Sequence, residues 1–142
     1  MTLFHATVVS LEGRGIMISG PSGSGKSDLA LRLIEEAGAR LVGDDYVTLT
    51  VEGGRLWARP ADNISGLIEV RGVGLVKMDF LPSAALDLVF ILPQPASGVQ
   101  PERLPEEQYF EHEGIRVRQL DFLPFEVSAV AKIKAALRHV LS

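Results

Sequence analysis

The sequence contains no cysteine, so it can form neither a disulfide framework nor a thiolate metal site. No charged-then-apolar leader stands at its N-terminus, and its longest apolar runs, such as residues 88–93, fall far short of the roughly 20 residues of a membrane helix. Basic residues are outnumbered, with 14 lysines and arginines against 18 aspartates and glutamates, which argues against a general nucleic-acid surface. We therefore expect a cytoplasmic protein with no nucleic-acid and no membrane partner.

The remaining composition is that of an ordinary globular protein. Apolar residues make up 46% and charged residues 23% of the chain, which excludes extensive disorder and fibrous repeats. A chain of 142 residues can bury a core and matches the size of one domain. We therefore expect residues 1–142 to form a single domain.

The order of apolar segments predicts an α/β fold. Glycine-interrupted β-branched segments predict hairpins over residues 3–19 and 47–58, whereas residues 29–37 and 127–141 repeat apolar side chains at helical spacing. The other expected elements are a strand at 41–42, a loop at 60–66, a strand at 68–76, a strand at 86–92, a proline-rich functional loop at 93–105 and two short strands around Gly114. Because regular βαβ alternation ends after the first unit, we expect a mixed sheet with flanking helices.

A phosphate-binding loop is predicted between the first hairpin and the first helix, where the sequence fits G-x-x-x-x-G-K-[ST]. Glycines let backbone N–H groups turn toward an anion, and the helix N-terminus adds a positive dipole. Lys26 supplies a mobile charge for the outer phosphates, and Ser27 supplies a hydroxyl for a phosphate-bound Mg²⁺. The predicted loop consists of Gly20, Pro21, Ser22, Gly23, Ser24, Gly25, Lys26 and Ser27.

The alternative interpretation of this motif is a glycine-rich turn that binds nothing. In a chain of this composition the four fixed positions would coincide by chance with a probability of about four in a thousand, before the strand and helix around them are considered. The motif therefore favours phosphate binding.

Two adjacent carboxylates, Asp44 and Asp45, follow the short predicted strand at residues 41–42. An Asp at the end of a strand can organise a metal beside a phosphate loop, or can accept a proton from an attacking hydroxyl. Neighbouring side chains in an extended segment point to opposite faces, so the two need not share one role. The alternative is a turn in which one of them caps the backbone.

Four separated segments resemble the catalytic C-terminal domain of the bacterial HPr kinase/phosphorylase family. His5 precedes the phosphate loop, Asp28 follows it, residues 41–47 resemble the family's LVADDxV, and residues 68–75 resemble its LEIRGLGI signature. Glu102-Arg103-Leu104 resembles its DRL segment. The resemblance implies a phosphate-loop fold of the HPr kinase/PEP carboxykinase type and a homo-oligomer, hexameric in the family. It also implies an ATP- and Mg²⁺-dependent serine kinase acting on an HPr-type phosphocarrier protein, with a regulatory role in the phosphotransferase system.

The resemblance also implies the roles of individual residues. Asp44 is expected to accept the proton in the kinase reaction, and Lys26 to hold ATP phosphates together with the loop amides. Ser27 and Glu69 are expected to reach Mg²⁺, which prefers one or two carboxylates plus phosphate oxygens. From its pattern alone, Glu69 could equally be a charge on a strand surface.

His5 and Arg103 are expected, by the same resemblance, to lie near the reacting phosphate. Taken alone, a single histidine in a strand is more often structural. Arg71 could form a salt bridge at the edge of the core or orient a phosphate. Trp57 is more typical of a core or an interface than of an adenine platform.

Two departures from the family limit the expected activity. Fuller members carry an N-terminal domain, so the resemblance covers a catalytic domain alone. The basic PVRPGRN-like segment tied to dephosphorylation is replaced here by residues 122–128, which contain no arginine and include Glu126. An anionic phosphate nucleophile needs positive charge around it, so phosphorylase activity is doubtful.

Two other functions are compatible with the motifs, namely a small-molecule kinase and a nucleotide-binding sensor without catalysis.

Overall fold

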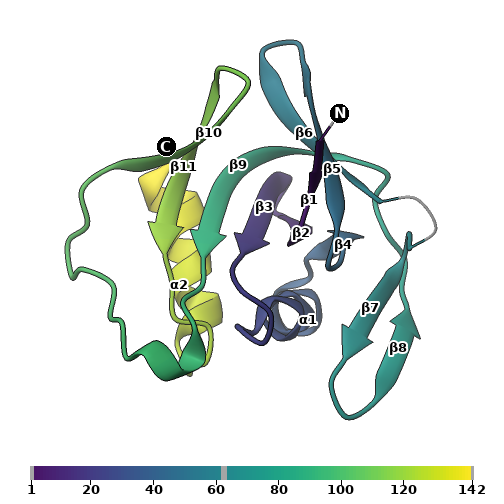
Figure 1. The fold of residues 1–142 in the computed structure, drawn as a ribbon, viewed down its shortest axis with the longest axis horizontal. Coiled ribbons are helices and arrows are strands. Elements are labelled where there is room, and N and C mark those ends of the chain that lie inside the picture. Colours follow the sequence, from purple (N-terminus) through teal and green to yellow (C-terminus); the bar gives the residue numbers. More distant parts are fainter. Residues whose placement is uncertain (1, 62–63, 142) are drawn as a thin grey trace.

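The computed structural model describes residues 2–61 and 64–141 of the chain. Within them, a large mixed sheet is accompanied by a separate two-stranded hairpin and by α-helices (Figure 1). The strands are β1 (Thr2–Phe4), β2 (Ala6–Leu11), β3 (Arg14–Ser19), β4 (Arg40–Gly43), β5 (Val47–Glu52), β6 (Arg55–Pro60), β7 (Leu67–Val70), β8 (Gly74–Lys77), β9 (Ala84–Ile91), β10 (Gln108–His112) and β11 (Ile115–Asp121). The helices are α1 (Lys26–Ala37), α2 (Ala129–Ala135), a 3₁₀ turn η1 (Pro95–Ser97) and a π-helical end η2 (Ala136–Val140).

The long strand β9 organises the large sheet. The strand order is β1-β5-β6-β9-β3-β2-β4, and the β10–β11 hairpin joins through β11 to β9. Strands β3 and β11 run parallel to β9, whereas the other neighbours are antiparallel. Figure 1 shows β9 curving between β3 and β11, with α2 behind them. The predicted α/β fold with a mixed sheet and flanking helices is confirmed.

Both faces of the central strands are buried, which explains their nearly continuous apolar sequences. Ile18 and Phe90 point to the face that packs against α1 and α2. Their neighbours Met17 and Val89 point to the opposite face, where strands β5 and β6 pack. The ends of β3 and β9 are therefore fixed from both sides, and the phosphate loop starts from the end of β3.

The predicted hairpins are confirmed, with two differences in detail. Residues 3–11 form two strands rather than one, because the chain bends at His5 between β1 and β2. Residues 68–76, expected as one interrupted strand, instead form the separate β7–β8 hairpin. Its turn contains Gly72 at φ +84°, which L side chains rarely adopt. The expected loop at 60–66 lies partly outside the described residues, since 62 and 63 are not described.

The final helix is shorter than its apolar stripe predicts. Helix α2 begins at Ala129 and continues into the π-helical turn that ends at Val140, so Val127 precedes it and is 99% exposed. Val130 and Ile133 form the buried stripe as expected. Among the described residues, no helix is long and apolar enough to cross a membrane.

Gly15 lets β3 pass close to β9 before the phosphate loop. A Cβ at this position would lie 2.2 Å from the backbone oxygen of Ala85, at a register shift between the two strands. No side chain can move to relieve that contact, since the obstructing atom belongs to the backbone of β9.

We expect Gly15→Ala to lower the free energy of unfolding by about 1–3 kcal/mol, because the strands must separate to admit the methyl group. Urea denaturation measures the effect. Gly54→Asn is the control, since a Cβ at Gly54 meets nothing within 4 Å and Asn tolerates its φ of +75°. Equal stability of Gly15→Ala and the parent chain would contradict the assigned contact.

Candidate active site

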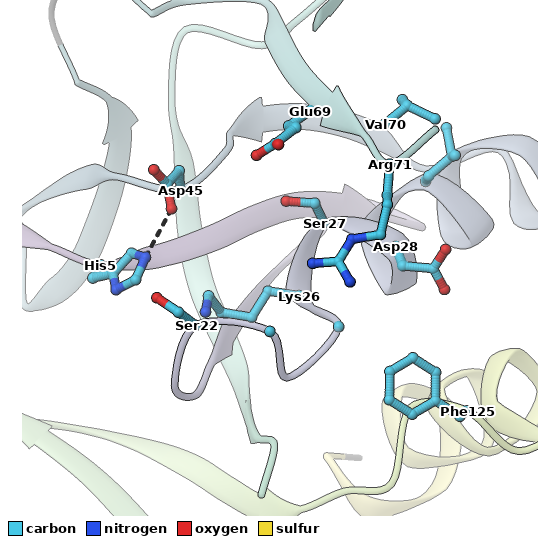
Figure 2. A pocket seen from close by; sticks show the side chains of 13 residues that line it. His5, Ser22, Lys26, Ser27, Asp28, Asp45, Glu69, Val70, Arg71 and Phe125 are labelled. Atoms are coloured by element: carbon cyan, nitrogen blue, oxygen red, sulfur yellow. Dashed lines mark hydrogen bonds and ion pairs between the residues drawn. The ribbon is translucent and has the colours of Figure 1, made fainter. Parts of the chain in front are cut away.

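A cavity of about 580 Å³ lies over the phosphate loop (Figure 2). The sheet brings to it residues from five separate segments: the bend after β1, the loop and the start of α1, the turn after β4, strand β7, and the segment before α2. The lining residues are His5, Ser22, Gly23, Gly25, Lys26, Ser27, Asp28, Leu31, Asp45, Glu69, Val70, Arg71 and Phe125.

The phosphate loop occupies the predicted position between β3 and α1, and its glycines are required by geometry. Gly23 and Gly25 have φ angles of +78° and +99°, and a Cβ at Gly20 would lie 2.8 Å from the backbone oxygen of Leu92. Helix α1 starts directly at Lys26, so the free N–H groups of its first turn adjoin the cavity. This arrangement is suited to an anion.

Lys26 is held against the loop that precedes it. Its Nζ donates to the backbone oxygens of Gly20 at 2.8 Å and Pro21 at 3.0 Å. Burial lowers the pKa of Lys26 below its ordinary value, and the negative charges of Asp45 and Asp44 oppose that shift. An ammonium group at this position can exchange carbonyl partners for phosphate oxygens.

Asp44 is a buried carboxylate that connects three neighbouring segments. Its Oδ1 accepts hydrogen bonds from the hydroxyls of Thr7, at 2.9 Å, and Ser27, at 2.6 Å. Its Oδ2 accepts one from the backbone N–H of Glu69 at 3.1 Å. The residue is only 4% exposed and is not among the side chains that line the cavity.

Asp45 has the opposite environment. It adopts a left-handed φ of +67°, and the backbone N–H of Tyr46 donates to the oxygen of Asp44 at 2.7 Å, which closes a γ-turn around it. This turn directs the exposed carboxylate into the cavity, where its Oδ1 lies 2.7 Å from Nε2 of His5. The ring of His5 stacks on Tyr46 with centroids 5.0 Å apart. Strained backbone of this kind is typical of functional sites.

The two aspartates therefore point apart, as expected of neighbours after a strand. Asp44 reaches the phosphate-loop hydroxyl, and Asp45 reaches the open cavity beside His5. Asp45 therefore lies where an acceptor hydroxyl could approach it, whereas Asp44, the residue expected from the resemblance to accept the proton, is occupied by the hydroxyl of Ser27.

The small hairpin brings Glu69, on strand β7, and Arg71, in the turn that follows it, to the cavity. The buried side chain of Ile68 anchors the hairpin in the helix-side core, while Glu69 is exposed toward Ser27 (Figure 2). These groups fit an Mg²⁺ ion that is bound to a phosphate: the ligands would be the hydroxyl of Ser27 and the carboxylate of Glu69, with the carboxylate of Asp44 behind the hydroxyl. The described residues contain no cluster of three or more acidic, histidine or cysteine side chains that could hold a metal alone.

Other sequence candidates lie elsewhere. Arg103 is exposed on the segment between η1 and β10 and does not line the cavity. Trp57 lies in β6, where its indole N–H donates to the backbone oxygen of Glu52 at 3.2 Å, and it does not line the cavity.

Three residues near the site were not predicted. Thr7 bridges the two aspartates, donating to Asp44 and accepting from the backbone N–H of Asp45 at 3.4 Å. Its only sequence signal is a hydroxyl within an apolar strand. Leu31 and Phe125 line the cavity, with Phe125 at the end away from His5 (Figure 2). No local pattern indicates Phe125, which lies 100 positions after Gly25.

Fold and site together define a phosphate-loop α/β protein with an acid–histidine pair facing the loop. Residues 1–128 match the family model described as HPr Serine kinase C-terminal domain, and the chain belongs to this family. The resemblance stated from the sequence motifs is confirmed.

Similar proteins carry the same family name. The HPr kinase/phosphorylase of Streptococcus thermophilus (strain ATCC BAA-491 / LMD-9) is 41% identical over 85 residues, and that of Streptococcus salivarius is 39% identical over 85 residues. Each match covers 59% of this chain and 27% of the relative, so the chain spans about a quarter of those proteins. The Hpr(Ser) kinase/phosphatase structure from Coxiella burnetii shares the fold, with a TM-score of 0.83 and 23% identity over 99% of this chain and 96% of that one.

The different environments of the aspartates predict different effects on stability. We expect Asp44→Asn to lower the free energy of unfolding by about 1–3 kcal/mol, because an amide nitrogen would face a hydrogen-bond donor in a buried site. Asp45→Asn is the matched control and should stay within about 0.5 kcal/mol of the parent chain, since Asn tolerates left-handed backbone and the side chain is exposed. Chemical denaturation measures both, and equal losses would refute the assigned environments.

Proposed function

We propose that this chain is an ATP- and Mg²⁺-dependent protein serine kinase that phosphorylates an HPr-type phosphocarrier protein. One observation carries the proposal: the phosphate loop with Lys26 faces the Asp45–His5 pair across a single cavity. Membership of the HPr serine kinase C-terminal domain family supports the same activity. Within this proposal, residues 1–142 form one catalytic domain.

The reaction assigns a task to each end of the cavity. Glycine-loop amides and Lys26 bind the phosphates of ATP, while Asp45 contacts the incoming serine hydroxyl. The serine oxygen forms a bond to the terminal phosphorus as the bond from that phosphorus to its bridging oxygen breaks. ADP leaves, and the serine proton passes to Asp45. His5 holds the carboxylate in position through its 2.7 Å hydrogen bond.

Asp44 has a metal-organising task in this proposal. Its Oδ1 accepts a hydrogen bond from the Ser27 hydroxyl at 2.6 Å, which leaves the lone pairs of the Ser27 oxygen available to a cation. Glu69 offers a second carboxylate from the opposite wall. Mg²⁺ bound there would neutralise charge on the transferring phosphoryl group.

Kinase activity is favoured over phosphorolysis because of the segment before α2. Residues 122–128 contain no basic residue, and the carboxylate of Glu126 is already paired with Lys132. Inorganic phosphate, acting as a nucleophile on phosphoserine, would find fewer positive charges than the family's basic segment provides. We further propose that the protein is a cytoplasmic homo-oligomer. Arg103 would act near the reacting phosphate only if its segment approaches the cavity over the phosphate loop.

Purified chain incubated with γ-labelled ATP, Mg²⁺ and an HPr-type carrier tests the proposal. We expect label on a serine of the carrier, and little release of that label when inorganic phosphate is added. Label on a metabolite in place of the carrier would support a small-molecule kinase. Bound but unconsumed ATP would support a nucleotide-binding sensor.

The roles of the two aspartates separate in kinetic measurements. Asp45→Asn should lower the rate of phosphoryl transfer by about 10²–10⁴-fold with nucleotide affinity retained, because the proton acceptor is lost. Asp44→Asn should instead raise the Mg²⁺ concentration needed for half-maximal activity, because Asp44 orients the Ser27 hydroxyl toward the metal. If Asp45→Asn keeps the parent rate while Asp44→Asn loses transfer at saturating Mg²⁺, Asp44 is the proton acceptor.

A further inference from the structure

Phe125 occupies an unusual position for a large apolar side chain. It is 61% exposed, yet its ring edge lies against the phosphate loop: a Cβ at Gly25 would come within 2.7 Å of its Cζ. The ring lines the cavity over the loop and also a second, mostly apolar cavity of about 270 Å³ formed with residues 93–100. An exposed aromatic face is thus available directly beside the predicted phosphate site.

The ring is held in place by the first helix. Arg32 of α1 donates from Nη1 to the backbone oxygen of Pro124 at 2.8 Å and from Nη2 to that of Glu126 at 3.4 Å. These two hydrogen bonds fix the backbone on both sides of Phe125. The segment is therefore attached to the helix whose N-terminus forms the phosphate site, and ring and loop keep a fixed relation.

The two ends of the cavity differ in chemistry. Figure 2 shows His5 and Asp45 at one end and Phe125 at the other, with Ser22 and Lys26 between them. The phosphoryl group that is transferred must lie near Asp45, so the remainder of a nucleotide extends away from it along the loop. That direction leads to Phe125, the aromatic ring of the cavity, with the charged side chains of Asp28 and Arg71 on the same side (Figure 2).

We infer that Phe125 is the stacking platform for the base of the bound nucleotide. This inference rests on the proposed function, since it places the base of the nucleotide whose phosphates occupy the loop. A planar base gains from stacking on an aromatic face whatever its hydrogen-bonding groups, so Phe125 contributes affinity rather than selection among bases.

Calorimetric titration with two probes separates base binding from phosphate binding. MgADP engages both parts of the site, whereas Mg²⁺-pyrophosphate engages only the phosphate loop. We expect Phe125→Ala to weaken MgADP binding by about 5- to 150-fold and to leave pyrophosphate binding unchanged. Phe125→Tyr should restore the affinity for MgADP. Val127→Ala, two residues along and 99% exposed, is the matched control and should change neither titration.

The other outcomes overturn the inference. If Phe125→Ala weakens both probes equally, the ring supports the shape of the loop at Gly25 and does not bind a base. Unchanged MgADP affinity in Phe125→Ala places the base elsewhere. If the parent chain binds pyrophosphate but not MgADP, the base subsite is absent although the loop functions. If it binds neither probe, the proposed kinase function itself fails. Circular dichroism verifies folding, and Phe125→Leu replaces the alanine variant if that variant does not fold.

Discussion

The hydrogen bonds to the buried carboxylate of Asp44 join the parts of the site. They connect Thr7 on β2, Ser27 at the start of α1 and the backbone of Glu69 on β7 to the end of β4. A buried carboxylate is costly unless its oxygens are satisfied, and here each oxygen has at least one donor. Because these donors come from separate segments, loss of the carboxylate would free both the Ser27 hydroxyl and the strand that carries Glu69.

The same arrangement explains why Asp45 can be strained. With Asp44 anchored by three donors, the chain must reverse at once to begin β5, and the left-handed γ-turn at Asp45 accomplishes this. Gly43 permits the close packing of this reversal, because a Cβ there would lie 2.7 Å from Val47 Cγ1 and 3.2 Å from the Cα of Pro60. The packing that buries one carboxylate therefore exposes the next beside His5.

Local patterns were sufficient for the parts of the site that are local. The loop motif and the helix after it lie within 18 consecutive residues, and the fold places them as predicted. The different environments of Asp44 and Asp45 depend on Thr7 and Glu69, which lie 37 and 25 positions from Asp44. No residue close in sequence therefore distinguishes the two aspartates. Phe125 is placed by Arg32, whose contact spans 92 positions. The sequence predicts one strand in place of the β7–β8 hairpin, because apolar residues continue on both sides of the turn at Gly72.

The burial of Lys26 lowers its pKa and favours the binding of an anion beside it. Burial disfavours its charged form and lowers its pKa, while two carbonyl oxygens of the loop only partly replace the lost water. A phosphate oxygen is a stronger partner than a carbonyl because it carries charge. Binding of a phosphate would therefore raise the pKa of Lys26 again, and the free energy lost in burying the ammonium would be recovered in the complex. In the proposed kinase, affinity for the phosphate chain would follow from burial of the cation before the ligand arrives, since little solvent or side chain must then reorganise.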